Sequence, residues 1–235
     1  MTAGVLYGLG VGPGDPELVT LKAYRILGEV PVIAWPAPQS GESLARSIVA
    51  PWLRGDREEI AIRMPLDARR FPAEEVYTRA VDAISRHLDA GRDVAAICEG
   101  DPFFYGSFMY LFARVADRYQ VEVVPGVSSL MACPAAAGVP LAARDDALLV
   151  CPGTLADAAM TERLALADSV AIIKVGRHLA RIRGVLDAAG LLGHAWYVAH
   201  ATMGHQVVMP LADVTEDAGP YFSMILVHRR GEAWR

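Results

Sequence analysis

The chain has 235 residues, of which 53% are hydrophobic and 21% charged, so it holds enough apolar material for one large domain or two smaller ones. Its 22 Lys and Arg residues against 27 Asp and Glu residues give a net charge of −5. This balance excludes the broad positive field that non-specific nucleic-acid binding requires, so an anionic partner must be met by local basic clusters.

The start of the chain and its most apolar stretch both argue against a targeting or membrane-spanning segment. The first residues, MTAGVLYGLG, lack the basic segment of a secretory signal and run directly into an apolar run and a loop. The stretch LMACPAAAGVPLAA is broken by Pro134, Gly138 and Pro140 and is too short to cross a bilayer. We therefore expect a cytoplasmic protein without membrane contact.

The cysteines and histidines show no metal-binding pattern. Cys98, Cys133 and Cys151 are far apart and odd in number, which is typical of buried thiols in a reducing compartment. The six histidines form no zinc-type spacing, so no bound metal is expected.

The first half of the chain alternates short apolar runs with amphipathic stretches. The predicted strands are Val5–Leu9, Val30–Ala34, Glu59–Ile62, Val94–Cys98 and Val121–Val124. The predicted helices lie at 16–27, 42–53, 73–90 and 104–118. Such alternation is typical of a mostly parallel sheet with helices on its faces, in which ligands bind beyond the carboxyl ends of the strands.

The second half differs in texture and predicts a second α/β domain with a mixed sheet. Its predicted strands are Leu148–Cys151, Val170–Lys174, Trp196–Val198 and Phe222–Val227. The turn at Pro125–Gly126 is the natural boundary, which gives domains at 1–125 and 126–235. We expect the ligand site in the cleft between the two domains.

The stretch YGLGVGPGDPEL, residues 7–18, is glycine-rich but does not match the usual phosphate-binding loops. Counted from Gly8 and Gly10, the third glycine of a dinucleotide fingerprint is replaced by Pro13, which has no N–H to donate. No Gly-Lys-Ser/Thr follows, and the carboxylates of Asp15 and Glu17 would repel a phosphate. The loop therefore indicates an uncharged or cationic ligand, and a nicotinamide-type oxidoreductase is disfavoured. The alternative is a tight strand-to-helix turn in which Asp15 caps the helix that follows.

A second loop, EGDPFFYGS at 99–107, follows the predicted strand that ends at Cys98. Gly100 allows a close approach of the backbone to a ligand, and Asp101 is placed to accept hydrogen bonds from hydroxyl or amino groups. Equally, Asp101 could cap a turn while the aromatic residues fill the core.

Three further stretches are candidate binding elements. In VPGVSS, Ser128 and Ser129 stand at a helix start, where a hydroxyl can cap the helix or bind a ligand. In KVGRHLARIR, Arg177, His178 and Arg181 stand at the start of another helix and suit carboxylates, although such a basic face is often only solvated. YVAHATMGHQ, residues 197–206, is a strand followed by a loop of small residues.

Taken in order, these stretches resemble the tetrapyrrole methylase family, and within it the group that methylates C20 of precorrin-2. YGLGVGPGDPELVTLKA, EGDPFFYGSFMYL, VVPGVSS, KVGRHL and YVAHAT are similar to successive signatures of that group, from Gly4 to about His228. The resemblance implies two α/β domains, a homodimer and S-adenosylmethionine as the cofactor, with no metal. The cofactor contacts that it implies are Pro13, Gly100, Asp101, Phe104, Ser128, Ser129, Val175, Ala201 and Thr202.

The implied reaction is transfer of the sulfonium methyl group to C20 of precorrin-2, which gives precorrin-3A in cobalamin biosynthesis. Asp15, Asp101 and His178 are candidates to take the C20 proton by their location. The anionic rim of the substrate needs local cations, for which the candidates are Arg177, His178, Arg181 and Arg63, then Arg69 and Arg70.

Several alternatives stay open. The substrate could instead be cobalt-factor II of the anaerobic pathway, or another tetrapyrrole. The low positive charge argues against RNA as a substrate. A protein that binds tetrapyrrole or cofactor without turnover belongs to a different functional class, and retention of every binding loop argues against it.

Overall fold

A computed structural model describes residues 2–53, 55–64 and 74–230 of the chain. The chain divides into two compact units, Met1–Ser128 and Ser129–Arg235. Each unit is built around one five-stranded sheet, the first parallel and the second mixed. The predicted fold class, two α/β domains with a parallel and a mixed sheet, is confirmed.

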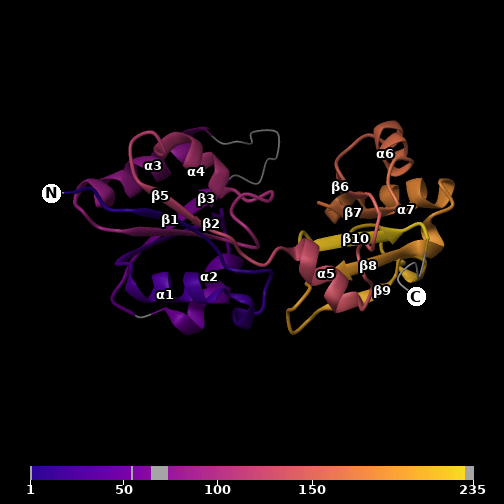
Figure 1. Ribbon diagram of the computed structural model, residues 1–235, viewed down its shortest axis with the longest axis horizontal. Coiled ribbons are helices and arrows are strands. Elements are labelled where there is room, and N and C mark those ends of the chain that lie inside the picture. The colour runs from indigo at the N-terminus through magenta and orange to yellow at the C-terminus, as the bar shows by residue number, and fades with distance from the viewer. Residues whose placement is uncertain (1, 54, 65–73, 231–235) are drawn as a thin grey trace. The chain divides into compact units, whose positions relative to one another are not determined.

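The sheet of the first unit has the strand order β3-β2-β4-β1-β5, and all neighbouring strands are parallel (Figure 1). Its strands are β1 (Leu6–Gly10), β2 (Val32–Pro38), β3 (Glu58–Met64), β4 (Val94–Cys98) and β5 (Val121–Val124). Its helices are α1 (Leu21–Glu29), α2 (Leu44–Val49), α3 (Glu74–Asp89) and α4 (Phe108–Val115), with short 3₁₀ turns η1 (Pro16–Leu18) and η2 (Ala50–Trp52). The register pairs Gly10 of β1 with Cys98 of β4, so these two strands end level with each other.

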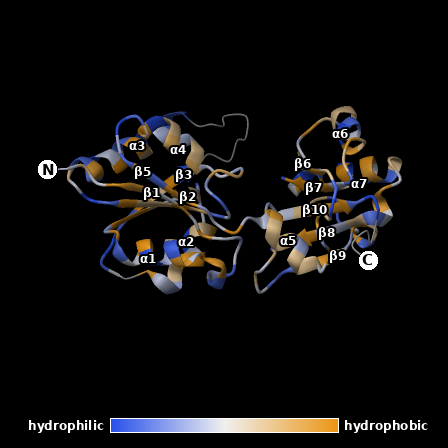
Figure 2. Cartoon of the chain, viewed as in Figure 1, coloured by the Kyte–Doolittle hydropathy of each residue, from blue (hydrophilic) through white to orange (hydrophobic). Residues whose placement is uncertain are grey.

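Helices cover both faces of this sheet, with α1 and α2 on one face and α3 and α4 on the other (Figure 1). Because successive strand residues point to opposite faces, Ile97 packs in the core under α1 and α2, whereas Cys98 packs in the core under α3 and α4. Each helix carries hydrophobic and hydrophilic residues together, as its position between core and solvent requires (Figure 2). Strands buried on both faces explain the continuous apolar runs in the sequence.

Two of the predicted helices start later than the sequence pattern indicated. The helix predicted at 16–27 is interrupted, because Val19 is extended and the Thr20 hydroxyl caps a new helix by accepting from Ala23 N–H at 3.3 Å. The helix predicted at 104–118 begins only at Phe108, because the residues before it form a turn around Asp101.

The sheet of the second unit has the strand order β6-β7-β10-β8-β9. Its strands are β6 (Leu148–Pro152), β7 (Ser169–Ile173), β8 (Ala195–Ala199), β9 (Val207–Pro210) and β10 (Ser223–His228). Strand β6 is parallel to β7, while β10 is antiparallel to both β7 and β8, so β7 and β8 run in the same direction. The edge strand β9, antiparallel to β8, was not predicted.

Helices also lie on both faces of the second sheet, with α6 and α7 on one side and α5 on the other (Figure 1). These are α5 (Ser129–Ala137), α6 (Asp157–Leu164) and α7 (Leu179–Ala188), with 3₁₀ turns η4 (Gly176–His178), η5 (Leu192–His194) and η6 (Leu211–Asp213). Residues of β7, β10, α6 and α7 share one apolar core.

None of the described helices has both the length and the hydrophobicity that a bilayer span requires.

The three cysteines are buried free thiols, as predicted. Burial raises the pKa of the Cys133 thiol to about 12 and also raises the pKa values of Cys98 and Cys151. At neutral pH these thiols are therefore protonated, which suits a packing role rather than nucleophilic chemistry.

Candidate functional site

Three loops of the first unit leave the sheet side by side at the carboxyl ends of β4, β1 and β5. They comprise residues 11–15, 99–107 and 125–128, and they belong to three of the motifs that the sequence singled out. Strand β1 lies between β4 and β5, so the loop after β1 is flanked by the other two. This is the edge at which parallel α/β sheets bind ligands.

The three loops approach one another so closely that only glycine fits at their contact. Gly12 and Gly100 exchange backbone hydrogen bonds, with Gly100 N–H donating to Gly12 O at 2.8 Å and Gly12 N–H to Gly100 O at 3.4 Å. A Cβ atom on Gly10 would lie 2.5 Å from Gly100 O and 2.6 Å from the backbone N of Gly126. Gly12 and Gly100 also have positive φ values, of 84° and 64°.

The Asp101 carboxylate ties the loop after β4 to the loop after β5. Its Oδ1 accepts hydrogen bonds from the N–H groups of Phe103 at 2.9 Å and Phe104 at 3.1 Å, and its Oδ2 accepts from Gly126 N–H at 3.1 Å. This is the turn-capping role that the sequence left open as an alternative. Its predicted role in proton transfer stays a prediction.

The loop after β1 ends at Asp15, whose Oδ1 accepts from Glu17 N–H at 2.8 Å as the cap of η1. Pro13, in the middle of the loop, is buried. Several backbone N–H groups of these loops are already engaged: that of Glu17 donates to Asp15, those of Phe103, Phe104 and Gly126 donate to Asp101, and those of Gly12 and Gly100 donate to each other's carbonyls. That this loop cluster binds a ligand without phosphate stays a prediction.

Two more predicted cofactor residues lie in the same cluster. The position that a Cβ on Gly100 would occupy is 3.8 Å from the Cα of Ser128, so the two backbones are in contact range. Phe104 is half-buried and packs edge-on against Tyr105, with ring centroids 5.1 Å apart. Pro13, Gly100, Asp101, Phe104 and Ser128 therefore all belong to the loops at one edge of the first sheet.

The remaining predicted cofactor residues belong to the second unit. Val175 follows β7, and Ala201 and Thr202 follow β8; because β7 and β8 run in the same direction, both loops leave one edge of the sheet. Val175 and Ala201 are buried, with 0% and 7% of their surface exposed, so they can offer a ligand mainly backbone groups. Ser129 is the exposed first residue of α5.

The predicted binding loops hold most of the unusual backbone conformations. Among the described residues, five non-glycine residues have positive φ, and four of them lie in these loops: Tyr105 at 56°, Lys174 at 55°, His200 at 51° and Thr202 at 70°. Such conformations are strained for L-residues and concentrate at functional sites. This feature is not visible in the sequence, where nothing distinguishes these residues from their neighbours.

The basic cluster at the start of α7 is only partly available for a ligand. Arg181 Nη1 binds Asp157 Oδ1 at 2.5 Å, and its Nη2 donates to the carbonyl of Gly153. Its predicted contact with a substrate carboxylate would require it to leave Asp157. Arg177 is exposed, and its guanidinium makes no hydrogen bond or ion pair with any of the described residues.

His178 lies between these arginines in η4 and is half-buried. Burial first, and then the positive charges of Arg181 and Arg177, lower the pKa of its imidazole below the usual 6.5. The ring is therefore neutral at pH 7, which makes it a better hydrogen-bond partner or base than a counter-charge for a carboxylate.

The predicted substrate arginine of the first unit, Arg63, lies near the end of β3, where its Nη1 donates to Pro38 O at 2.9 Å. It therefore anchors the segment that follows β2 while its side chain stays exposed. Arg69 and Arg70 lie outside the described residues.

Sequence reasoning missed Glu99, the residue directly after β4. The Glu99 carboxylate accepts a hydrogen bond from Ala45 N–H at 3.1 Å, and burial raises its pKa. The available signal was an acidic residue that ends an otherwise apolar strand and directly precedes Gly100. His200 was also missed: its Nδ1 is buried without a hydrogen-bond partner among the described residues, and its ring is tilted by 50° against that of His205, with the ring centroids 4.2 Å apart.

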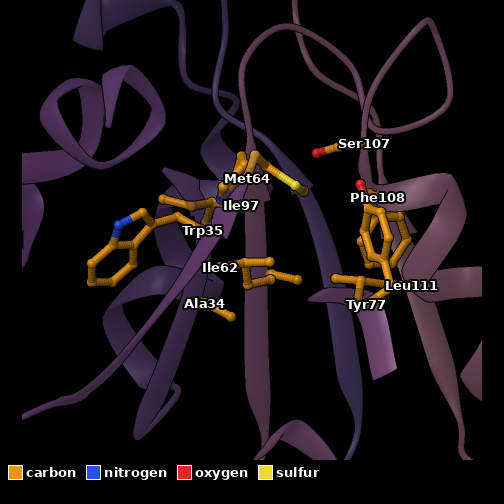
Figure 3. Close-up of a pocket in the computed structure, with 11 residues that line it drawn as sticks. Ala34, Trp35, Ile62, Met64, Tyr77, Ile97, Ser107, Phe108 and Leu111 are labelled. Carbon is orange, nitrogen blue, oxygen red and sulfur yellow. The ribbon is translucent and has the colours of Figure 1, made fainter. Parts of the chain in front are cut away.

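A small apolar pocket lies elsewhere in the first unit, between the sheet and helices α3 and α4 (Figure 3). Its walls include Trp35, Met64, Tyr77, Phe108 and Leu111, and it contains none of the predicted site residues. Burial strongly raises the pKa of the Tyr77 phenol. We interpret the pocket as a packing gap beside the core rather than as the ligand site.

In the described part of the chain, no three His, Cys, Asp or Glu side chains are grouped as metal ligands.

Comparison with known proteins identifies similar sequences over almost the whole chain. Residues 5–215 match the family of Tetrapyrrole (Corrin/Porphyrin) Methylases. The chain is 45% identical to the cobalamin biosynthesis protein CobIJ of Mycobacterium tuberculosis over 95% of its own length but only 46% of that protein. The chain thus spans about half the length of this curated relative.

Two other relatives match from end to end. The precorrin-2 C(20)-methyltransferase of a Sinorhizobium species is 41% identical, with 95% of each chain covered. The cobalt-precorrin-2 C(20)-methyltransferase of Salmonella typhimurium is 36% identical over 97% of this chain and 98% of its own. Among solved structures, the uroporphyrin-III C-methyl transferase of Thermus thermophilus in complex with S-adenyl homocysteine matches with a TM-score of 0.70 and 26% identity, covering 95% of this chain and 97% of that chain.

The close backbone contact around Gly10 predicts a large cost for any side chain there. We expect Gly10→Ala to lower the free energy of unfolding by about 3 kcal/mol, because the new methyl group would force the β1 and β4 loops apart. As a control, Gly28→Ala in α1 meets no atom within 4 Å and should leave stability unchanged or raise it by up to about 1 kcal/mol. Urea unfolding followed by circular dichroism measures both, and equal stabilities would contradict the tight contact.

The three hydrogen bonds at Asp101 predict that its carboxylate contributes more to stability than the cap at Asp15. Asp101→Asn replaces one acceptor oxygen with an amino group and should cost about 1.5–3 kcal/mol, the range for a hydrogen bond to a charged group. Asp15→Ala should cost only about 1 kcal/mol, as is usual for an N-cap. The same unfolding assay compares them, and an Asp101→Asn variant as stable as wild type would rule out the capping role.

His178 should titrate below pH 6.5, because its folded-state pKa is lowered. Between the lowered folded-state pKa and the unfolded value of 6.5, the unfolded chain binds more protons at His178 than the folded chain does. The contribution of His178 to the free energy of unfolding should therefore increase as the pH rises through this range. Arg181→Ala should raise the NMR titration midpoint of His178 only part of the way, since burial is the larger cause. Arg183→Ala on the same helix, where the side chain binds Val214 O, serves as the control. A wild-type midpoint at or above 6.5 would contradict this assignment.

Proposed function

The chain belongs to the tetrapyrrole (corrin/porphyrin) methylase family, and from this membership we propose that it transfers a methyl group from S-adenosylmethionine to C20 of precorrin-2, giving precorrin-3A in cobalamin biosynthesis. One observation carries the choice of reaction: 41% identity, over 95% of both chains, to the precorrin-2 C(20)-methyltransferase of Sinorhizobium. The greater identity to CobIJ supports the same pathway.

The chemistry of the first-unit loops fits this cofactor. S-adenosylmethionine carries no phosphate, and its sulfonium is a cation that supplies the methyl group when the cofactor is bound. The contact of Gly10, Gly12 and Gly100 is built from backbone without side chains, and the amides of Gly12 and Gly100 already donate to each other's carbonyls. The amides of Phe103, Phe104 and Gly126 donate to the Asp101 carboxylate. Such a surface accepts a neutral or cationic ligand and disfavours an anionic one. We propose that Pro13, Gly100, Asp101, Phe104 and Ser128 hold the cofactor on this unit.

On the second unit we propose Ser129, Val175, Ala201 and Thr202 as cofactor contacts. Two of these residues are buried and one has a positive φ, so their backbone groups rather than their side chains are suited to recognition. Held in rigid, strained loops, such groups bind without further loss of conformational freedom.

The main task of the protein in this reaction is to position the two reactants. C20 of the substrate is conjugated to pyrrole nitrogens and is already nucleophilic, so orientation supplies much of the acceleration, up to about 7–11 kcal/mol in well-aligned systems. A neutral His178 could take the proton that leaves C20, and it is the candidate whose lowered pKa favours this role. Asp15 and Asp101 are weaker candidates, because their carboxylates already accept backbone hydrogen bonds.

The substrate carries carboxylates on its rim, and an acidic protein must meet them locally. Arg177 is the best candidate, because it is exposed beside His178, and Arg63 is the candidate on the first unit. We also propose that the site forms between the two domains and that the protein is a cytoplasmic homodimer that binds neither nucleic acid nor membranes. These statements rest on the resemblance and on the charge balance.

The second candidate substrate is the cobalt-loaded ring, cobalt-precorrin-2 or cobalt-factor II. It is favoured by the 36% identity, again end to end, to the Salmonella enzyme. Both rings present C20 in the same way, so the residues described above would serve either reaction.

Mass spectrometry of anaerobic incubations tests the function directly. The chain is incubated with S-adenosylmethionine and, separately, with precorrin-2 and with cobalt-factor II. We expect one added methyl group on precorrin-2, located at C20 by carbon-13 labelling. Faster turnover of the cobalt-loaded ring would assign the anaerobic pathway instead. Binding of cofactor by calorimetry without methyl transfer to either ring would contradict the proposal and favour another tetrapyrrole substrate or a carrier.

A further inference from the structure

Glu99 is a half-buried acidic residue whose side chain connects the end of β4 to helix α2. It directly follows β4 and precedes Gly100 of the glycine contact. Alternation along β4 turns its side chain to the same face as Ala95 and Ile97, which is the face covered by α1 and α2. There its Oε1 accepts the hydrogen bond from Ala45 N–H in the first turn of α2, at 3.1 Å.

The hydrogen bond from Ala45 to Glu99 fixes the segment that connects β2 to α2, residues 39–43. Two other contacts hold the same segment: the Ser43 hydroxyl donates to Pro36 O at 2.6 Å, and Arg63 Nη1 donates to Pro38 O at 2.9 Å. The segment leaves β2 at the edge of the sheet where the glycine loops also leave, because β2 and β4 are parallel neighbours. Glu99 therefore links the segment to the strand that carries Gly100 and Asp101.

A carboxylate is an expensive choice for a merely structural hydrogen bond at this place. Among the described residues no Lys, Arg or His pairs with Glu99, and burial raises its pKa. The nearest titratable groups on its own strand and loop are the buried Cys98 thiol and Asp101, neither of which is a cation. On α2, Arg46 binds Glu59 at 3.0 Å and lies over the Trp35 ring. A neutral residue would provide the same hydrogen bond at less cost, which points to a use in function.

We propose that Glu99 is a positioning residue for the tetrapyrrole substrate: it holds the β2–α2 connection, residues 39–43, in the conformation that receives the ring. This inference rests on the function proposed above. We assign the connection to the substrate side of the site, because it directly follows Pro38, the partner of the substrate candidate Arg63, and includes none of the cofactor candidates.

Variants at Glu99 separate this role from general folding. Glu99→Ala removes the acceptor, and Glu99→Gln keeps an acceptor oxygen of nearly the same shape. Glu99→Asp keeps the charge but moves the acceptor one methylene away from Ala45. Ser43→Ala removes the hydrogen bond from the Ser43 hydroxyl to Pro36 O, which also holds this connection, and it tests the idea even if Glu99→Ala does not fold. Glu162→Ala, which removes an exposed carboxylate on α6 of the other unit, is the matched control.

Each purified variant is measured in two ways. Hydrogen–deuterium exchange of peptides that cover residues 39–49 reports how firmly the connection is held. Steady-state kinetics report KM for precorrin-2 separately from kcat and from the affinity for S-adenosylmethionine. We expect Glu99→Ala to speed exchange in this segment and to raise KM for precorrin-2 about tenfold, with cofactor affinity within about twofold of wild type. Glu99→Gln should largely restore both, and Glu99→Asp and Ser43→Ala should lie between.

Two results would overturn the proposal. One is unchanged exchange in residues 39–49 of Glu99→Ala, and the other is faster exchange with unchanged KM for precorrin-2. If the proposed function is wrong, the wild-type protein itself will methylate neither precorrin-2 nor cobalt-factor II, which distinguishes that failure from a failure of the Glu99 proposal. In that case the exchange data and the affinity of each variant for precorrin-2, measured by calorimetry, still decide whether Glu99 positions the connection for a tetrapyrrole.

Discussion

The contact of three backbone segments at Gly10, Gly100 and Gly126 is the constraint on which the first unit depends. It brings the loops after β1, β4 and β5 together at a distance that no side chain permits. Asp101 then holds the contact in place through hydrogen bonds to two of these loops. Close backbone packing and the hydrogen bonds of Asp101 therefore hold the same few residues in place. The shape of this loop cluster does not depend on a bound ligand.

The same arrangement determines the charge of the site. In many α/β proteins the free amides at loop and helix starts attract phosphate, but here side-chain carboxylates from Asp15 and Asp101 already accept hydrogen bonds from them. The cations of the second unit are likewise partly engaged, since Arg181 binds Asp157. The loops of the first unit are the proposed position of the cationic cofactor, and the exposed Arg177 of the second unit is the proposed contact for substrate carboxylates.

Local and periodic features of the sequence predicted much of this structure, and long-range features could not be predicted. The apolar runs gave the strands of both sheets, and the Asp15–Pro16 pair gave the turn after the glycine loop. The strand β9 was missed because Val207–Pro210 is short and half-exposed, and it lies at the edge of the sheet, where it pairs with β8. The ion pair of Arg181 with Asp157 joins residues 24 positions apart, and the bond from Ala45 to Glu99 joins residues 54 apart. No pattern within a single window contains such contacts.

The central position of β1 has a consequence for the synthesis of the chain. Its two neighbours, β4 and β5, begin at residues 94 and 121, whereas β2 and β3 can pair with each other much earlier. During synthesis on the ribosome, β1 therefore cannot pair with either neighbour until roughly 100 further residues have been added, which takes about 5–20 s at usual elongation rates. During that interval the segment is a natural binding site for chaperones, and the glycine contact can form only after β5 has emerged.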